Sequence, residues 1–255
     1  PDANLIVAPS DHMIENTESF KQNCLNALAF TASNNAFVTL GIKPTYANTG
    51  YGYIQFEKET NSKGIYPVKR FTEKPNKETA IEFFNEASYL WNSGIFIWKV
   101  SDIVNAFRFY MPDMFDVFKC GLIDFNTPKE AAAVKHIYKR CESISIDYAI
   151  LEKAKNVHVI PANFDWSDLG TWNSAWENFE KDTAQNAVAG DNTLMVDANG
   201  CIVHSTDKKL VLVGGVNDLI IVNTPDALLV CKKENEQQIK EYLAKVKETK
   251  GELYL

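Results

Sequence analysis

Clusters of lysine and arginine are missing from this sequence, and so are long apolar runs. Its 255 residues carry 26 basic and 33 acidic side chains, which gives a formal net charge of −7 at pH 7. A nucleic-acid surface needs clustered basic residues, so we expect no nucleic-acid partner. No apolar run reaches the roughly 20 residues that span a membrane, and no signal-like segment occurs. We therefore predict a soluble, cytoplasmic protein with no membrane partner.

Cysteine and histidine are too few and too scattered for a disulfide framework or a zinc site. The five cysteines are odd in number and include no CxxC pair, and the four histidines show no ligand spacing. We expect the cysteines to be reduced packing residues. The chain also lacks an initial methionine and begins with Pro1-Asp2-Ala3-Asn4 directly ahead of an apolar run. This start is typical of a fragment cut from a longer protein.

Strand-like and helical patterns alternate through the first part of the chain. The apolar run at residues 5–8 is typical of a strand covered on both faces in a parallel sheet. Residues 100–140 are mainly helical, with breaks at Pro112 and near Pro128, and are expected to cover the sheet. The pattern predicts an α/β domain over residues 1–181. The other expected strands are residues 36–40, 65–72 and 157–161, and the other expected helices are residues 17–33, 77–87 and 148–154.

The pattern changes over residues 182–255. Short runs rich in Val, Leu and Ile alternate with turn residues about every eight positions, which is typical of an all-β module. The module is either a small sandwich or a stack of β-helix coils. Residues 234–249 carry Ile239, Leu243 and Val246 at helical spacing, which predicts a terminal helix. We see no catalytic cluster here, so we expect this module to support assembly, as a possible homodimer surface.

Two aspartates lie where a metal site would be expected. Asp11 follows the first strand, and ligands gather at the carboxyl ends of strands in doubly wound sheets. Asp168 lies on the loop between residues 157–161 and an amphipathic segment, where a carboxylate can face a polyanion through a metal. The alternatives are a turn role for Asp11 and helix capping by Asp165 or Asp168. A carboxylate pair for glycoside hydrolysis is also open, because sequence spacing gives no carboxyl separation.

Other polar groups interrupt the apolar pattern. Gly52, in a Gly-Tyr-Gly step, could let the backbone approach a ligand closely, although a plain turn is equally simple. Glu73 and Lys74 end a strand and could bind a sugar hydroxyl and a phosphate, or form a solvated surface pair. Asn92, in an Asn-Ser-Gly interruption that marks a bulge, carries a bidentate amide that suits a sugar diol. We interpret Asp147 as a helix cap.

Six short motifs follow one another along the chain. They are Pro9-Ser10-Asp11-His12, Thr49-Gly50-Tyr51-Gly52-Tyr53-Ile54, Phe71-Thr72-Glu73-Lys74-Pro75, Tyr89-Leu90-Trp91-Asn92-Ser93-Gly94, Ser145-Ile146-Asp147-Tyr148-Ala149 and Trp166-Ser167-Asp168-Leu169-Gly170-Thr171-Trp172. Their order resembles that of the mannose-1-phosphate guanylyltransferase family of sugar-phosphate nucleotidyltransferases, and the resemblance covers nearly the whole chain.

The resemblance implies a reaction and a fold. The reaction is transfer of a guanylyl group from GTP to mannose 1-phosphate by direct in-line attack, giving GDP-mannose and pyrophosphate. The fold is a Rossmann-like nucleotidyltransferase sheet with helices on both faces, followed by a β-helix-like module. By the same resemblance, Asp11 and Asp168 form the catalytic pair and hold the divalent cation, Mg²⁺.

The resemblance also implies a sugar-phosphate site and a missing part. Glu73 would bind mannose hydroxyls, Lys74 would bind the sugar phosphate, and Asn92 with the Gly52 backbone would hold the ring. The family opens with a Gly-rich loop of the form GxGxRxxP, followed by a lysine, that binds the triphosphate. This sequence has no such loop, so we expect an N-terminally truncated chain that is inactive alone. The alternatives are a non-catalytic sugar-phosphate-binding module and a nucleotidyltransferase for another hexose 1-phosphate.

Overall fold

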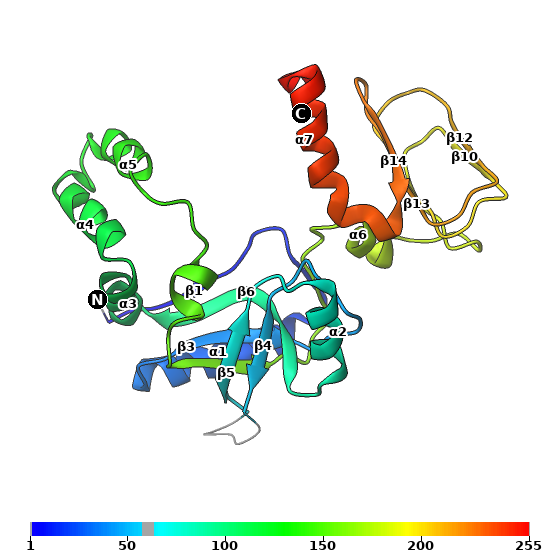
Figure 1. The fold of residues 1–255 in the computed structure, drawn as a ribbon. Helices are drawn as coiled ribbons and strands as arrows, with labels where there is room; N and C mark the ends of the chain where they lie inside the picture. Colours follow the sequence, from blue (N-terminus) through cyan, green and yellow to red (C-terminus); the bar gives the residue numbers. More distant parts are fainter. Residues whose placement is uncertain (1, 58–63, 255) are drawn as a thin grey trace. The chain divides into compact units, whose positions relative to one another are not determined.

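The computed structural model describes residues 2–57 and 64–254. They form two compact units (Figure 1). The first unit holds the chain up to Ser10 together with Ile14–Trp166, and the second holds Asp11–Met13 together with Ser167–Leu255. The domain boundary predicted after residue 181 lies inside the second unit and stays a prediction.

The first unit is built on a six-stranded mixed sheet. The strand order is β1-β6-β3-β7-β5-β4, and β4 also pairs with β6. Only the β3–β7 pair among these is parallel. The strands are β1 (Asn4–Val7), β3 (Phe37–Ile42), β4 (Tyr53–Phe56), β5 (Tyr66–Thr72), β6 (Tyr89–Lys99) and β7 (Val157–Pro161). Two short strands, β2 (Met13–Ile14) and β8 (Trp166–Ser167), pair separately.

Helices cover both faces of this sheet, as predicted. Alternate residues of β3 point to opposite faces, so Leu40 joins the core cluster that includes α1 and α2, whereas Phe37 joins the cluster that includes α3 and η2. The helices of this unit are α1 (Thr17–Ser33), α2 (Lys77–Asn85), α3 (Val100–Tyr110), α4 (Pro112–Gly121), the 3₁₀ turn η1 (Leu122–Asp124), α5 (Glu130–Tyr138) and η2 (Asp147–Leu151), which is a π-helix.

The first strand is predicted to be parallel to its neighbours and covered on both faces, and this prediction is wrong. It exists as β1, but it pairs antiparallel with β6 and ends the strand order. The exposed fractions are 42% for Leu5, 41% for Ile6 and 45% for Val7. An apolar run identifies a strand, but it does not give the number of elements packed around it. Within the described residues, β1 is therefore an exposed edge strand.

The Asn-Ser-Gly interruption in β6 is a bulge, as predicted. Thr39 of β3 pairs with Phe96, whereas Gly41, two residues later, pairs with Asn92, four residues earlier in β6. The strand accommodates two extra residues at this point. Gly94 adopts a φ of 71°, a left-handed conformation in which glycine has no Cβ to clash.

The second unit contains a small parallel β-helix, which confirms the stacked-coil alternative. Strand β11 lies between β9 and β13 in parallel register, and β10 pairs in parallel with β12. Paired residues such as Ile202 and Ile220 are 18 positions apart, so each coil stacks on the next. The strands are β9 (Ala187–Ala189), β10 (Thr193–Val196), β11 (Ile202–Ser205), β12 (Val211–Gly214), β13 (Leu219–Asn223) and β14 (Leu228–Lys232), which is antiparallel to β13.

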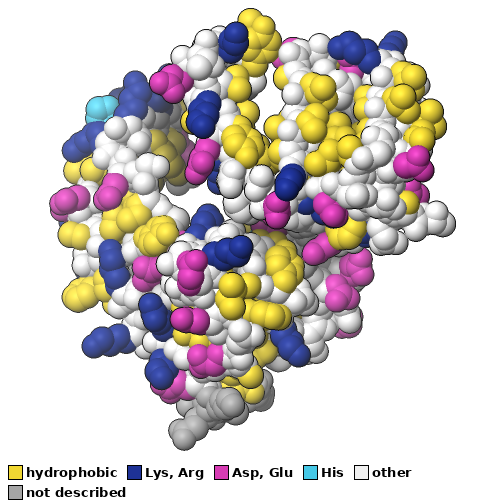
Figure 2. Space-filling model, turned by 45° about the vertical axis from the view of Figure 1, so that its right-hand side comes forward, with side chains coloured by type: hydrophobic (Ala, Val, Ile, Leu, Met, Phe, Trp, Pro, Cys, Tyr) yellow, Lys and Arg dark blue, Asp and Glu magenta, His cyan; other side chains and the backbone are white. Residues whose placement is uncertain are grey.

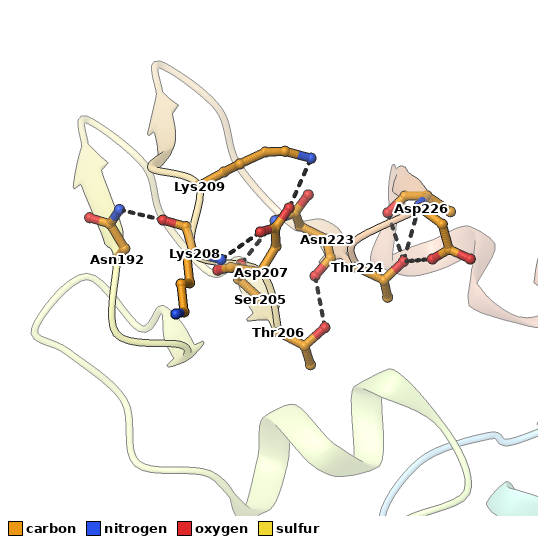
Figure 3. A network of polar contacts seen from close by, with 10 residues as sticks. Asn192, Ser205, Thr206, Asp207, Lys208, Lys209, Asn223, Thr224 and Asp226 are labelled. Carbon is orange, nitrogen blue, oxygen red and sulfur yellow. Dashed lines mark hydrogen bonds and ion pairs between the residues drawn. The ribbon is translucent and has the colours of Figure 1, made fainter.

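Polar side chains join the turns of successive coils (Figure 3). The Asn223 amide donates to Ser205 Oγ at 3.0 Å. The Asp207 carboxylate accepts the Lys208 backbone N–H at 2.6 Å and lies 2.8 Å from the Lys209 ammonium. These contacts satisfy turn groups that the parallel ladder leaves unpaired.

Helix α6 (Trp172–Asn178) packs on the β-helix. Its residues Trp172 and Trp176 lie against a buried core of Ala187, Ile202 and Ile220. The terminal helix is also present. The remaining elements of this unit are the 3₁₀ turn η3 (Lys233–Gln238), α7 (Ile239–Lys250) and the 3₁₀ turn η4 (Glu252–Tyr254).

Charges of both signs are interspersed with apolar side chains on the face shown in Figure 2. No helix formed by residues 2–57 or 64–254 is long and apolar enough to cross a membrane.

Candidate functional site

Strand register brings three of the predicted binding residues together. Tyr53 of β4 pairs with the last residue of β5 and with a residue of β6. Gly52 directly precedes Tyr53, and Glu73 and Asn92 directly follow its two partners, so all three lie one step beyond the same row of paired residues. The Asn92 backbone N–H donates to the Gly52 carbonyl oxygen at 2.8 Å.

Glu73 lies in contact with Gly52. A Cβ atom added to Gly52 would collide with Glu73 Oε2 and would lie 3.4 Å from Asn92 Cβ. The glycine is therefore needed to make room for the carboxylate. On its other side, Glu73 Oε1 lies 3.3 Å from Lys74 Nζ, and the Glu73 side chain is only 11% exposed whereas that of Lys74 is 58% exposed.

The side-chain amide of Asn92 is held in one orientation by three partners. Its Oδ1 accepts hydrogen bonds from the Thr39 hydroxyl at 3.1 Å and from the Gly94 backbone N–H at 3.2 Å. Its Nδ2 donates to Asp147 Oδ1 at 3.2 Å. The bidentate use of this amide that the sequence suggests is thus reduced, because the oxygen is already occupied and one N–H remains.

Burial raises the pKa values of two carboxylates in this cluster. Burial is the main cause for Glu73, the nearby Asp147 carboxylate raises its pKa further, and Lys74 opposes the shift. Burial also raises the pKa of Asp147, against the hydrogen bonds from its own backbone N–H, Ser145 and Asn92. Two partly desolvated carboxylates beside one lysine favour a ligand that brings hydrogen-bond donors.

The predicted metal pair lies in the second unit. The carboxylates of Asp11 and Asp168 both act on the His12 imidazole, where burial lowers the pKa and the two negative charges raise it. Asp168 Oδ1 also accepts the Gly170 backbone N–H at 3.0 Å. Both aspartates therefore lie near one imidazole.

Helix α6 is not capped by either aspartate that precedes it. Its N-cap is Thr171, whose hydroxyl accepts the Ser174 backbone N–H at 3.1 Å, while Ser174 Oγ accepts the Thr171 N–H. The Asp168 carboxylate instead closes the turn before the cap. The capping alternative for Asp165 and Asp168 is wrong.

The sequence interpretation missed several residues of the cluster. Asp147 does not act as a side-chain cap: the N-cap of η2 is Ile146, without a side-chain hydrogen bond. Thr39 orients Asn92, and Glu152 Oε1 accepts the Glu73 backbone N–H at 3.2 Å. Both are ordinary polar residues in an apolar strand and a helical segment. The only sequence signal was the order of motifs, which contains Asp147.

These features define the chain as an α/β protein with an added β-helix and a polar cluster suited to ligand binding. A mixed α/β sheet with helices on both faces, followed by a parallel β-helix, carries a cluster of two carboxylates, one amide and one ammonium. Such a cluster can accept hydrogen bonds from several hydroxyls and pair with one anionic group.

The comparisons with known proteins then give the family. The nucleotidyl transferase model matches residues 1–185, and the mannose-phosphate isomerase and GMP-like beta-helix model matches residues 191–246. The chain belongs to the nucleotidyl transferase family. The β-helix match agrees with the stacked coils of the second unit.

Curated relatives are similar in sequence to this chain over most of its length. The chain is 34% identical to a mannose-1-phosphate guanylyltransferase of Escherichia coli over 92% of this chain and 51% of the relative. It is 35% identical to one of Salmonella typhimurium over 94% and 49%. The chain thus spans about half the length of these curated relatives. A crystal structure described as mannose-1-phosphate geranyltransferase from Thermus thermophilus superposes with a TM-score of 0.81 at 28% identity, covering 96% of this chain and 70% of that one.

Proposed function

We propose that this chain provides the sugar-phosphate site of an enzyme that transfers a guanylyl group from GTP to mannose 1-phosphate, releasing pyrophosphate and GDP-mannose. The observation that carries the proposal is the cluster of Glu73, Lys74 and Asn92 around Gly52, in a chain related over most of its length to mannose-1-phosphate guanylyltransferases.

Each side chain of the cluster has a role that follows from its chemistry. The Lys74 ammonium, which is more than half exposed, pairs with the sugar phosphate. The largely buried Glu73 carboxylate accepts hydrogen bonds from sugar hydroxyls, and the Asn92 N–H that has no acceptor among the described residues donates one. Gly52 lets the Glu73 carboxylate reach the sugar ring, because the Cβ atom of any larger residue would occupy the position of the carboxylate.

Asp11 and Asp168 have the donor chemistry for Mg²⁺. The residues between 2 and 57 and between 64 and 254 contain no group of three or more His, Cys, Asp or Glu side chains arranged as a metal cage. Magnesium does not need one, since it binds through one or two carboxylates plus phosphate oxygens and water. Asp11 and Asp168 would hold the ion, which would supply positive charge that neutralises phosphate oxygens.

The reaction balances without a covalent enzyme intermediate. A phosphate oxygen of mannose 1-phosphate attacks the α-phosphorus of GTP, the bond from that phosphorus to the bridging oxygen breaks, and pyrophosphate leaves with the electron pair. The residues of this chain bind, orient and neutralise charge, which is what phosphoryl-type transfer needs most.

The proposal is tested by calorimetry of the 255-residue chain with hexose 1-phosphates in the presence of Mg²⁺. We expect mannose 1-phosphate to bind more tightly than glucose or galactose 1-phosphate, and Lys74→Gln to weaken binding at least about tenfold, as loss of a charge-assisted contact does. GTP-dependent formation of GDP-mannose reports the transfer step. Tighter binding of another hexose 1-phosphate, or formation of another nucleotide sugar, would contradict the proposed substrate.

The metal role has its own test. We expect Asp168→Asn to weaken the Mg²⁺-dependent binding of GDP-mannose while the melting temperature stays within a few degrees of the unsubstituted chain. Asp165→Asn is the matched control, because Asp165 lies three residues earlier in the sequence, just before β8, and is exposed. Equal Mg²⁺ dependence in both variants would remove Asp168 from the metal site.

A further inference from the structure

Asp147 lies at a structural irregularity beside the candidate site. It begins η2, a π-helix of five residues. π-Helical turns are rare and occur often at functional sites. The following residues of η2 pack on the face of the sheet that carries Leu90 and Phe96 of β6. Side chains at alternate positions of a strand point to the same face, so Asn92 lies on the same face of β6 as Leu90 and Phe96. The Asn92 amide and the π-helix that begins with Asp147 are therefore on one side of the sheet.

The hydrogen bonds of Asp147 leave acceptor capacity unused. Its carboxylate accepts from the Asn92 amide, from Ser145 and from its own backbone N–H. An ionised carboxylate offers about four lone-pair positions. At least one position therefore remains for which residues 2–57 and 64–254 supply no hydrogen-bond donor.

The Asn92 amide likewise has a hydrogen-bond donor that is not used. Its oxygen is occupied by Thr39 and Gly94, and one amide hydrogen is occupied by Asp147. The second amide hydrogen has no acceptor in the part of the chain that the structure describes. A sugar hydroxyl can both donate and accept, so one hydroxyl can accept from Asn92 and donate to Asp147.

We propose that Asp147 is a sugar-binding and positioning residue: it holds the Asn92 amide with its remaining N–H available to the ligand, and its carboxylate accepts a hydrogen bond from a ligand hydroxyl. The inference rests on the proposed function. It adds a second carboxylate to Glu73, so the site recognises at least two ligand hydroxyls as donors, while Lys74 binds the anionic group. A phosphate without a sugar makes only the Lys74 contact.

The test uses Asp147→Asn in the 255-residue chain. The variant keeps size and shape but replaces an acceptor oxygen by an amide nitrogen. We expect the affinity for mannose 1-phosphate to fall at least about tenfold, and the affinity for inorganic phosphate to stay unchanged. Asp116→Asn, an exposed aspartate in α4, is the matched control and is expected to change neither affinity.

The monodeoxy analogues of mannose 1-phosphate separate a direct contact from a structural effect. The unsubstituted chain and Asp147→Asn should bind one of these analogues equally well, namely the one that lacks the hydroxyl bound by Asp147, because both partners of one contact are then removed. For the other analogues, Asp147→Asn should bind more weakly than the unsubstituted chain by the same factor as for mannose 1-phosphate. A purely structural role for Asp147 would weaken all of them equally and would overturn the proposal.

The outcomes distinguish this inference from the proposed function. If the unsubstituted chain binds none of the hexose 1-phosphates, the proposed function fails and the role of Asp147 fails with it. If the unsubstituted chain binds mannose 1-phosphate and Asp147→Asn binds it equally, only the role of Asp147 is overturned. If Asp147→Asn does not fold, Asp147→Ser, which removes the carboxylate and keeps a small polar group, is measured against the same expectations.

Discussion

At the scale of single residues, the site depends on a glycine whose missing side chain makes room for a carboxylate. A Cβ atom at position 52 would overlap Glu73 Oε2, which is the end of a flexible side chain and can move away. A larger residue at position 52 is therefore accommodated by displacing Glu73, at the cost of its contact with Lys74.

The first residue-scale prediction concerns Gly52→Ala. We expect the affinity for mannose 1-phosphate to fall about tenfold or more, while the variant remains folded because the displaced group is flexible. Calorimetry and thermal unfolding measure the two effects. The matched control is Gly214→Ala in β12, where a Cβ would meet only an ordinary contact at 3.5 Å. Unchanged binding by Gly52→Ala would show that the Glu73 position is not used.

A second residue-scale prediction concerns pH. Because the pKa of Glu73 is raised above 4.5 in the folded chain, the folded state binds the proton more tightly than the unfolded state. The ionised Glu73 therefore costs stability, and this cost appears as the pH rises from 4.5 through the folded pKa. We expect Glu73→Gln to stabilise the chain relative to the unsubstituted form, by more at pH 7.5 than at pH 4.5, while it loses mannose 1-phosphate binding.

The pH prediction is measured by thermal unfolding at both values. Glu82→Gln in α2 is the control, because Glu82 is exposed and its substitution should shift stability little and equally at both values. A Glu73→Gln variant that is less stable at pH 7.5 than at pH 4.5, relative to the unsubstituted chain, would contradict the sign of the effect.

The candidate residues could be predicted from sequence, but their contacts could not. The motifs identify Gly52, Glu73, Lys74 and Asn92 as residues to consider. Their meeting point depends on the antiparallel register of β4 with β5 and β6, which a single sequence does not specify. Asp147 was interpreted as a cap because aspartate before a short helix usually is one, and a π-helix has no recognisable sequence pattern.

At the scale of elements, the loop that carries Asp168 is held by the helix that follows it. Near its start, α6 is tied to η3: the Asn173 backbone N–H donates to Glu236 Oε2 at 2.8 Å. One turn later, Lys233 Nζ lies 3.4 Å from the centroid of the Trp176 ring and donates to the Gly200 carbonyl oxygen at 2.8 Å. The α6–η3 contact therefore positions the chain just after Asp168.

The element-scale prediction concerns Glu236→Ala. We expect a loss of about 1–2 kcal/mol in the free energy of unfolding, since the variant leaves a helix N–H without its charged acceptor. Urea unfolding measures this change. Glu234→Ala is the matched control: its carboxylate is 70% exposed and pairs with Lys232 on the surface, so its loss should be within about 0.5 kcal/mol. Equal losses would show that Glu236 does not hold α6.

The helices and strands can be predicted from the sequence better than the elements that pack against them. The helical spacing of residues 17–33 and the break at Pro112 are confirmed, because amphipathic spacing and proline act locally. The bulge in β6 is confirmed for the same reason, since Gly94 marks it. The burial of β1 is wrong, because an apolar strand has the same pattern at an edge as in the middle of a sheet.

At the scale of the whole chain, the two compact units do not follow the order of the sequence. The second unit takes up Asp11–Met13 from the start of the chain as well as Ser167–Leu255. Both proposed metal ligands thus belong to the unit that contains the β-helix. The sequence alone assigns both aspartates to the α/β domain, because the pattern of short apolar runs typical of the β-helix begins only near residue 182. Dimerisation through the β-helix stays a prediction, which sedimentation of the chain can test.

The whole-chain prediction concerns truncation after Lys181, at the boundary expected from sequence. Such a chain keeps Asp168 but removes the buried core on which Trp172 and Trp176 of α6 pack. We expect these tryptophans to become exposed, with a red-shifted fluorescence emission, and Mg²⁺-dependent GDP-mannose binding to be lost because α6 no longer positions the Asp168 loop. A chain ending at Lys240 is the control, since it keeps the β-helix and Ile239. If truncation after Lys181 leaves emission and binding unchanged, the Asp168 loop folds without the β-helix and the domain boundary lies where the sequence places it.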